Sequence, residues 1–301
     1  MIRSLFAGFI ALTCIAYAPT AQAQLFTPFA AESDSGIDGP AYAAIENELV
    51  QLQTEFPALA QRVVYGRSVK GANLNLIRIA SANAQQNVGR AVVITGATHG
   101  NEYLGIEDKL PRVFLSGLKD LPRLREFLMK GGIVYIAPIF NPDGYAADAR
   151  GNANGIDLNR DFPLPPTGKP GFTQPETKYF VEYLRQDLTK SKSGLSVAID
   201  YHCCIGAFLY PWSYTNTPLA QPDLKRFQGL GALLRLPFGE KYGLGTTYDI
   251  LGYYAFGTSK DYYFGTTAAL AYTFEGKYRT EKDNLVKHVA MWESVFAYLA
   301  Q

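Results

Sequence analysis

The chain of 301 residues is 48% hydrophobic and 18% charged, an ordinary composition for a globular protein. Its 28 basic and 27 acidic residues give a formal net charge of +1, so neither nucleic acid nor another polyanion is indicated as a partner. A chain of this length can bury a large core, and α/β enzymes of this size often form one domain.

The N-terminal residues 1–23 predict an export signal. Arg3 is followed by an apolar run and by the small-x-small cleavage pattern Ala21-Gln22-Ala23. The apolar run is too short to span a bilayer, and no later segment has about 20 apolar residues in a row. We therefore predict an exported protein, periplasmic or secreted, without a transmembrane segment. A loose lead-in over residues 24–40 would precede one folded domain over residues 41–301.

Helices are predicted where apolar residues recur every three or four positions, and strands where short apolar runs lie between turn residues. In chain order these are helix 42–56, strands 63–65, 74–80 and 91–95, helices 103–119 and 121–129, strand 133–138, helix 176–188, strands 195–201 and 208–210, helix 222–236, strand 269–274 and helix 282–299. Thr173 and Glu176 predict a capping box for the helix over 176–188. The alternation predicts a single α/β domain with a central mixed, largely parallel, twisted sheet flanked by helices.

Two histidines and a glutamate fall just after predicted strands. His99 and Glu102 follow the strand over 91–95, and His202 follows the strand over 195–201. Ligands bind at the carboxyl ends of strands in open α/β sheets, so these side chains can meet at one edge. Imidazole nitrogen and carboxylate oxygen suit zinc, and a catalytic zinc keeps one position open. The spacing of His99 and Glu102 alone is weak, because it also fits a surface histidine with a solvated glutamate.

Glu275 ends the apolar strand over 269–274, where a carboxylate beside a metal can act as a general base. The alternative is a surface glutamate paired with Lys277 or Arg279, and the local sequence leaves both open.

Residues 141–166 are rich in Asn, Asp, Gly and Pro and predict a long irregular loop, a kind of segment that often carries function. Within it lie Arg150, Asn159 and Arg160, and the guanidinium group of an arginine suits bidentate binding of a carboxylate. Asp157 can instead accept a hydrogen bond from a ligand histidine. The alternative is a solvated polar loop.

The remaining cysteines and histidine are harder to assign. Cys203 and Cys204 are adjacent, so they form either a vicinal disulfide or two buried thiols. His288, the third histidine, is predicted to be partly exposed on the last helix.

Six short segments together resemble the zinc metallocarboxypeptidases of the pancreatic carboxypeptidase A family, in that family's order and over residues 42–299. They are His99-x-x-Glu102, Asn141-Pro142-Asp143-Gly144-Tyr145, Asp157-Leu158-Asn159-Arg160, Asp200-Tyr201-His202, Leu209-Tyr210-Pro211-Trp212 and Thr273-Phe274-Glu275. The resemblance implies the carboxypeptidase A-like fold. The sequence differs from the family in a short loop between Asn141 and Asp157, and Cys203-Cys204 stands where the family has a non-proline cis peptide.

The resemblance also implies roles for individual residues. One zinc ion per chain would be held by His99, Glu102 and His202. Glu275 would be general base and acid, and Arg150 would polarise the scissile carbonyl. Asn159 and Arg160 would hold the C-terminal carboxylate of the substrate, and Tyr253, next to Tyr254, would be the mobile tyrosine that caps it.

Lys260 is placed by the resemblance at the base of the side-chain pocket. The family has an aliphatic residue there in enzymes that cut after apolar residues, and an acidic residue in enzymes that prefer basic ones. A buried cation favours an anionic partner, so a preference for C-terminal Glu or Asp is expected. The alternative is that Lys260 turns outward and leaves the pocket to Tyr248 and other aromatic residues.

The expected function is zinc-dependent hydrolysis of the C-terminal peptide bond of exported or periplasmic peptides, by a monomer whose partner is a peptide with a free C-terminal carboxylate. One alternative on the same scaffold is a carboxypeptidase or amidase that trims the stem peptides of peptidoglycan. The other is an inactive relative that only binds peptide, which need not retain the three ligands and Glu275.

Overall fold

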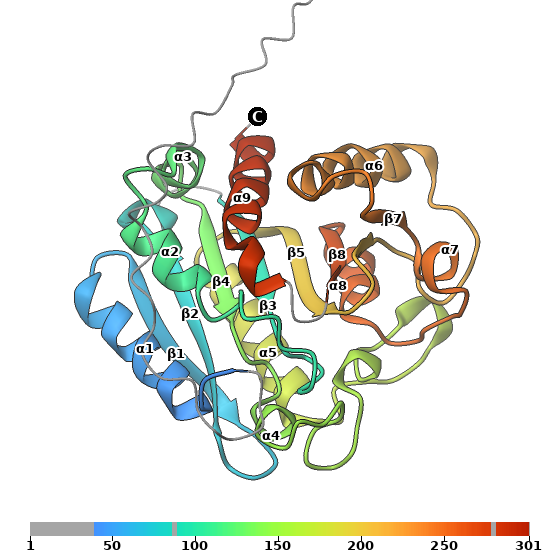
Figure 1. Cartoon of the computed structure of the whole chain (residues 1–301), viewed down its shortest axis with the longest axis horizontal. Helices are drawn as coiled ribbons and strands as arrows, with labels where there is room; N and C mark the ends of the chain where they lie inside the picture. The colour runs from blue at the N-terminus through green and yellow to red at the C-terminus, as the bar shows by residue number, and fades with distance from the viewer. Residues whose placement is uncertain (1–38, 86–88, 278–280, 301) are drawn as a thin grey trace, which may run out of the picture.

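The computed structural model describes residues 39–85, 89–277 and 281–300, so the predicted export signal lies outside the described residues. It forms one eight-stranded sheet in the order β1-β2-β4-β3-β5-β8-β6-β7. Helices cover both faces of this sheet, with α9 lying across the strands β4, β3 and β5 (Figure 1). None of the described helices has the length and apolar character that a membrane span requires.

The strands are β1 (Ala60–Arg67), β2 (Asn73–Ala80), β3 (Arg90–Thr95), β4 (Ile133–Ala137), β5 (Gly194–Cys203), β6 (Ala207–Leu209), β7 (Gly243–Gly245) and β8 (Leu270–Gly276). The α-helices are α1 (Tyr42–Glu55), α2 (Leu110–Ser116), α3 (Pro122–Met129), α4 (Pro142–Ala146), α5 (Pro175–Lys190), α6 (Gln221–Arg235), α7 (Thr247–Leu251), α8 (Ser259–Thr267) and α9 (Leu285–Ala300).

The centre of the sheet is parallel: β4, β3, β5 and β8 run in the same direction. β2 pairs antiparallel with β4, β1 with β2, and β6 with β8, whereas β6 and β7 are parallel. The predicted mixed, largely parallel sheet is therefore confirmed. Because β3, β5 and β8 end at the same edge, side chains that follow these strands are brought together there.

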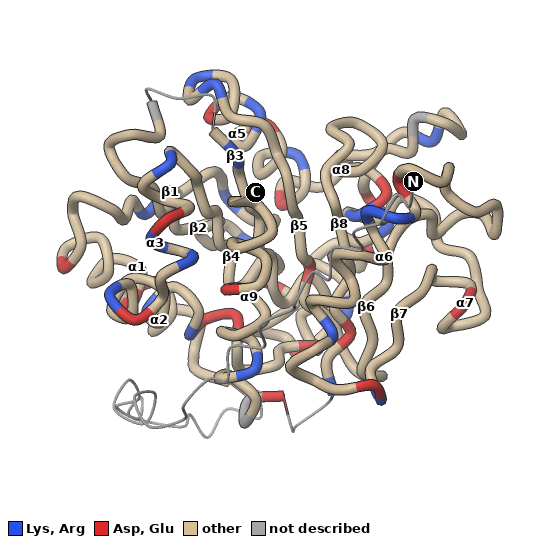
Figure 2. Tube along the Cα trace, turned by 90° about the horizontal axis from the view of Figure 1, so that it is seen from above, with Lys and Arg blue, Asp and Glu red and all other residues tan. Residues whose placement is uncertain are grey.

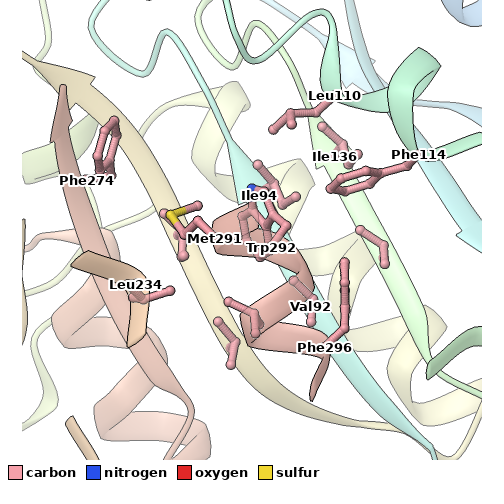
Figure 3. Packing of buried hydrophobic residues seen from close by; sticks show 14 of the residues in the cluster. Val92, Ile94, Leu110, Phe114, Ile136, Leu234, Phe274, Met291, Trp292 and Phe296 are labelled. Carbon is pink, nitrogen blue, oxygen red and sulfur yellow. The ribbon is translucent and has the colours of Figure 1, made fainter. Parts of the chain in front are cut away.

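Apolar layers cover both faces of the sheet. On one face, side chains from the central strands pack against side chains from helices α2, α6 and α9 (Figure 3). The strand residues include Val92, Ile94 and Ile136, and the helix residues include Leu234, Met291, Trp292 and Phe296. On the other face, α5 contributes Phe180, Val181 and Leu184. Basic and acidic residues are interspersed along the trace (Figure 2), in agreement with the near-zero net charge.

The helix predicted over 103–119 is wrong in its first half, because α2 begins only at Leu110. Residues before it form turns around the buried Glu107, whose carboxylate accepts hydrogen bonds from the backbone N–H groups of Leu104 and Ile106. Gly105 has φ 75°, which a right-handed helix does not allow. Burial raises the pKa of Glu107 to about 7.

The predicted capping box is also wrong. Helix α5 begins after Gln174, whose side chain makes no capping hydrogen bond. The carboxylate of Asp161, from the preceding loop, instead accepts hydrogen bonds from the backbone N–H groups of Thr173 and Gln174 and from the hydroxyl of Thr177. A capping group from a distant segment leaves no local pattern at the helix start.

His288 is fully buried in α9, against the prediction of a partly exposed residue. Its Nδ1 lies 3.1 Å from the hydroxyl of Tyr201, and its Nε2 lies 3.1 Å from Oε1 of Glu281.

Helix α9 itself starts at Leu285 rather than at the predicted residue 282. The predicted loop over 141–166 contains the short helix α4, and the elements β7, α7 and α8 were not predicted at all.

Candidate active site

Three strands deliver the predicted site residues to one edge of the sheet. His99 follows β3, while His202 and Glu275 lie near the ends of β5 and β8, directly opposite each other in the parallel register. Gly100 lets the turn after β3 pack tightly, because a Cβ atom there would lie 2.0 Å from the backbone of Gly144. The turn that carries His99 is therefore held against α4.

His99, Glu102 and His202 converge on a common point. Their ligand atoms lie within 4.8 Å of one another. Nδ1 of His99 is 2.8 Å and Nδ1 of His202 is 2.9 Å from Oε2 of Glu102, and the two Nδ1 atoms are 3.0 Å apart. Both histidines are buried. Two imidazole nitrogens and a carboxylate oxygen that face one point form a donor set that fits zinc.

The outer nitrogens of both histidines face carboxylates. Nε2 of His99 lies 2.9 Å from Oδ1 of Asp157, and Nε2 of His202 lies 3.0 Å from Oδ2 of Asp200. An ionised carboxylate only accepts hydrogen bonds, so each Nε2 carries the proton and each Nδ1 presents its lone pair to the shared point. Asp157 therefore lies where a residue that orients His99 is needed.

Electrostatics favour a negative charge on Glu102. Burial opposes ionisation, but the adjacent imidazoles of His202 and His99 outweigh it and hold the pKa of Glu102 well below its ordinary range. Glu275 behaves differently, since burial raises its pKa to about 7 and the nearby Glu102 carboxylate acts in the same direction. The two carboxyl groups thus suit different tasks, one as a permanent anion and the other as a proton acceptor near neutral pH.

Arg150 reaches the centre from the exposed part of the loop. Its Nη1 donates to Oε1 of Glu102 at 3.0 Å, and its Nη2 donates to Oδ2 of Asp157 at 3.0 Å. The guanidinium therefore lies beside the ligand Glu102, next to the shared point of the three donors.

Asn159 and Arg160 follow in the 3-10 helix Leu158–Arg160. Asn159 is buried between His202 and the start of α8. Nδ2 lies 3.2 Å from Nε2 of His202, and Oδ1 accepts a hydrogen bond from the backbone N–H of Ser259 at 3.0 Å. Arg160 donates from Nη1 to the carbonyl oxygen of Asn159 at 2.8 Å. The structure thus places Asn159 against the ligand His202, with Arg160 beside it.

Lys260 lies in the first turn of α8 and is only 2% exposed, so it does not turn outward. Its Nζ donates to the hydroxyl of Thr247 at 3.0 Å. Burial lowers the pKa of Lys260, although the nearby carboxylates of Asp261 and Glu275 act in the opposite direction. The ammonium is therefore a buried cation whose hydrogen bond goes to the neutral hydroxyl of Thr247.

Aromatic residues line the segment between Thr247 and Gly257. Tyr253 is 46% exposed. Tyr248 and Tyr254 are also exposed and stack on each other, with ring centroids 4.8 Å apart. Because the ring of Tyr254 is already stacked, the structure leaves Tyr253 as the less constrained of the two neighbouring tyrosines.

Cys203 and Cys204 are paired as a vicinal disulfide, directly after the ligand His202. The peptide bond between them is cis, in the place where the resemblance implies such a bond. The backbone N–H of Cys203 donates to Oε2 of Glu102 at 3.4 Å, so this turn contacts a second ligand.

Asp200 and Ser259 are site residues that the sequence analysis missed. Asp200 is two residues before His202 on β5, and residues i and i+2 of a strand share one face. That spacing was a usable signal for a carboxylate beside a ligand histidine. Ser259 had no such signal, because its helix was not predicted.

The chain matches a family model described as zinc carboxypeptidase over residues 45–289. Carboxypeptidase SOL1 of Arabidopsis thaliana is 34% identical over 125 residues, which are 40% of this chain and 25% of that protein. The match therefore spans about a quarter of the length of SOL1.

Solved structures share the fold. Carboxypeptidase A from Helicoverpa armigera aligns with a TM-score of 0.68 at 20% identity, covering 87% of this chain and 73% of that one. The murein-tripeptide amidase MpaA from Escherichia coli O157 aligns with a TM-score of 0.50 at 19% identity, covering 78% of this chain and 91% of that one. At these identities the likeness shows a common architecture.

Proposed function

This chain belongs to the zinc carboxypeptidase family, and we propose that it hydrolyses the C-terminal peptide bond of exported or periplasmic peptides. The observation that carries the proposal is the convergence of His99, Glu102 and His202 on one point, with Glu275 opposite His202 on the next strand. A binding module has no need of a partly buried carboxyl group beside three such donors.

The residues divide the chemistry among them. His99, Glu102 and His202 would hold the zinc ion, which when bound lowers the pKa of water and polarises a carbonyl oxygen. Glu275 accepts the proton of the attacking water and returns it to the leaving amine.

Substrate recognition falls to the arginines. Arg150 brings positive charge to the oxygen of the scissile carbonyl, where negative charge develops in the transition state. Arg160 supplies a planar guanidinium for the terminal carboxylate of the substrate, beside Asn159. Tyr253 closes over the bound residue.

A free C-terminal carboxylate is expected to be essential. The zinc-loaded protein should release the last residue of a peptide, whereas the same peptide with an amidated C-terminus should be cleaved at least ~10²-fold more slowly, because loss of a charge-assisted bidentate contact costs several kcal/mol. Liquid chromatography of both digests measures the ratio. Equal cleavage of the two peptides would show that the terminal carboxylate is not recognised.

Lys260 supports a preference for an acidic C-terminal residue. Its buried ammonium can pair with a carboxylate and repels a cationic side chain. We expect kcat/KM to be higher for peptides ending in Glu than for matched peptides ending in Phe or Lys. In Lys260→Ile, the ratio of kcat/KM for the peptide ending in Glu to kcat/KM for the peptide ending in Phe should fall by about tenfold or more. A buried ion pair typically contributes more than the ~1.4 kcal/mol that a tenfold change requires.

The control for this experiment is Lys241→Ile, an equal loss of charge at an exposed position. It should leave the Glu to Phe ratio unchanged. If the wild-type protein prefers Phe to Glu, or if Lys260→Ile leaves the ratio as it was, Lys260 does not select the substrate.

The same pocket favours a second candidate function. An amino acid that carries an additional carboxylate, as some cell-wall residues do, would satisfy Lys260 equally well, and a murein-tripeptide amidase shares the fold. The proposed mechanism would be unchanged. Digestion of purified sacculi beside ordinary peptides separates the two functions.

A further inference from the structure

The carboxylate of Asp200 contacts Nε2 of His202, the ring nitrogen that faces away from the shared point of the three donors. Its Oδ2 faces Nε2 of His202 at 3.0 Å, while its Oδ1 accepts hydrogen bonds from the hydroxyls of Thr95 and Thr98, both at 2.7 Å. Thr98 directly precedes His99. Asp200 thus ties the turn that carries one ligand histidine to the outer nitrogen of the other.

Ser259 makes two contacts with this assembly. Its hydroxyl donates to Oδ2 of Asp200 at 2.9 Å, and its backbone N–H donates to Oδ1 of Asn159 at 3.0 Å. Asp200 and Asn159 are the two residues whose side chains lie against Nε2 of His202. Ser259, Asp200 and Asn159 are all buried, so water does not compete with these hydrogen bonds.

The hydroxyl of Ser259 is not needed to start helix α8. Thr258 is the N-cap residue, and its side chain accepts the hydrogen bond from the backbone N–H of Asp261. A serine that served only the helix would have no reason to reach a carboxylate on β5. The hydroxyl is therefore available for the one acceptor that it contacts, Asp200.

We infer that Ser259 is a positioning residue for His202, acting through Asp200 and Asn159, and that it joins the metal centre to the specificity pocket. The next residue in the chain, Lys260, donates from Nζ to the hydroxyl of Thr247. The first turn of α8 thus contacts the carboxylate behind His202 with one residue, and with the next it supplies the cation proposed to select the substrate. This inference rests on the proposed function, because it assigns Ser259 a role toward zinc.

The test is the zinc affinity of Ser259→Ala, measured by competition with a chromogenic chelator. Partners that orient a metal ligand from behind typically contribute ~10–100-fold to metal affinity, so the dissociation constant for zinc should rise about tenfold. The zinc-loaded variant should also lose kcat with little change in KM, because Lys260 and Thr247 are kept. The visible spectrum of the cobalt-substituted protein should change as His202 is held less firmly.

Ser213→Ala is the matched control. Ser213 is equally buried and also contacts the start of α8, through Thr258 and Asp261, but it does not contact Asp200 or Asn159. Its zinc affinity should equal that of the wild type. The inference is overturned if Ser259→Ala and Ser213→Ala bind zinc equally well, whereas a wild-type protein that binds no zinc overturns the proposed function itself.

A second variant covers the case in which Ser259→Ala does not fold. Asp200→Asn keeps the shape of the side chain but removes its charge. It should weaken zinc binding by at least as much as Ser259→Ala does. In the double variant, loss of the Ser259 hydroxyl should add little, because the hydroxyl acts through the charge that is already gone. Unchanged zinc affinity in Asp200→Asn, or full additivity in the double variant, contradicts the role assigned to Ser259.

Discussion

His202→Ala is expected to lose stoichiometric zinc and, with it, peptide hydrolysis. His202 supplies one of three donors that face a common point, and its Nδ1 lies 2.9 Å from the carboxylate of Glu102. Removing it leaves one imidazole and one carboxylate, too few to hold a catalytic zinc ion tightly. His99→Ala should behave in the same way. Elemental analysis of dialysed protein gives the metal content, and added zinc should not restore activity at concentrations that saturate the wild type.

His288→Gln is the control for this loss. It removes the remaining histidine of the chain, which is buried but contacts Tyr201 and Glu281 rather than the three donors. That variant should retain one zinc ion per chain. Full metal occupancy in His202→Ala would withdraw His202 from the ligand set.

Glu275→Gln is expected to keep zinc and substrate binding but to lose ~10²–10⁴-fold in kcat, the usual contribution of a general base. Glutamine has nearly the same shape as glutamate but cannot accept the proton of the attacking water. Steady-state kinetics on a single peptide gives kcat, and calorimetry with the uncleaved peptide gives binding. Metal content measured on the same sample excludes loss of zinc as the cause.

The exposed Glu240 offers a matched control with the same chemical change. Glu240→Gln should turn over at the wild-type rate. Should Glu275→Gln keep a near-normal kcat, the base must be sought elsewhere in the site.

The ends of the central strands were predictable because their apolar runs are short and continuous. The runs before His99, His202 and Glu275 mark strands that are buried on both faces, and the polar residue after each run marks where the strand leaves the core. No single apolar run, however, predicts that the three side chains come close together. It depends on β3, β5 and β8 being neighbours and parallel, which is set by packing of the whole sheet.

Helix α8 was missed because Ser259–Thr267 has no helical apolar spacing. Its large residues Tyr262, Tyr263 and Phe264 are consecutive, and the helix packs on several sides at once. The error at residues 103–109 has a related cause, since the buried Glu107 organises turns with hydrogen bonds that no local pattern encodes. At α8 tertiary contacts decide the structure, whereas at residues 103–109 local hydrogen bonds to a buried carboxylate do.

Strand pairing in this sheet sets the spacing of the reactive groups. His202 lies opposite Glu275, and Cys203 lies opposite Gly276, along a continuous parallel ladder between β5 and β8. A slip of one residue would turn Glu275 to the other face of the sheet, and it would also exchange the places of the large Tyr272 and Phe274 with that of the small Ala271. The packing that seats Phe274 in the core therefore also fixes Glu275 opposite His202, so the core and the site are aligned by the same strand register.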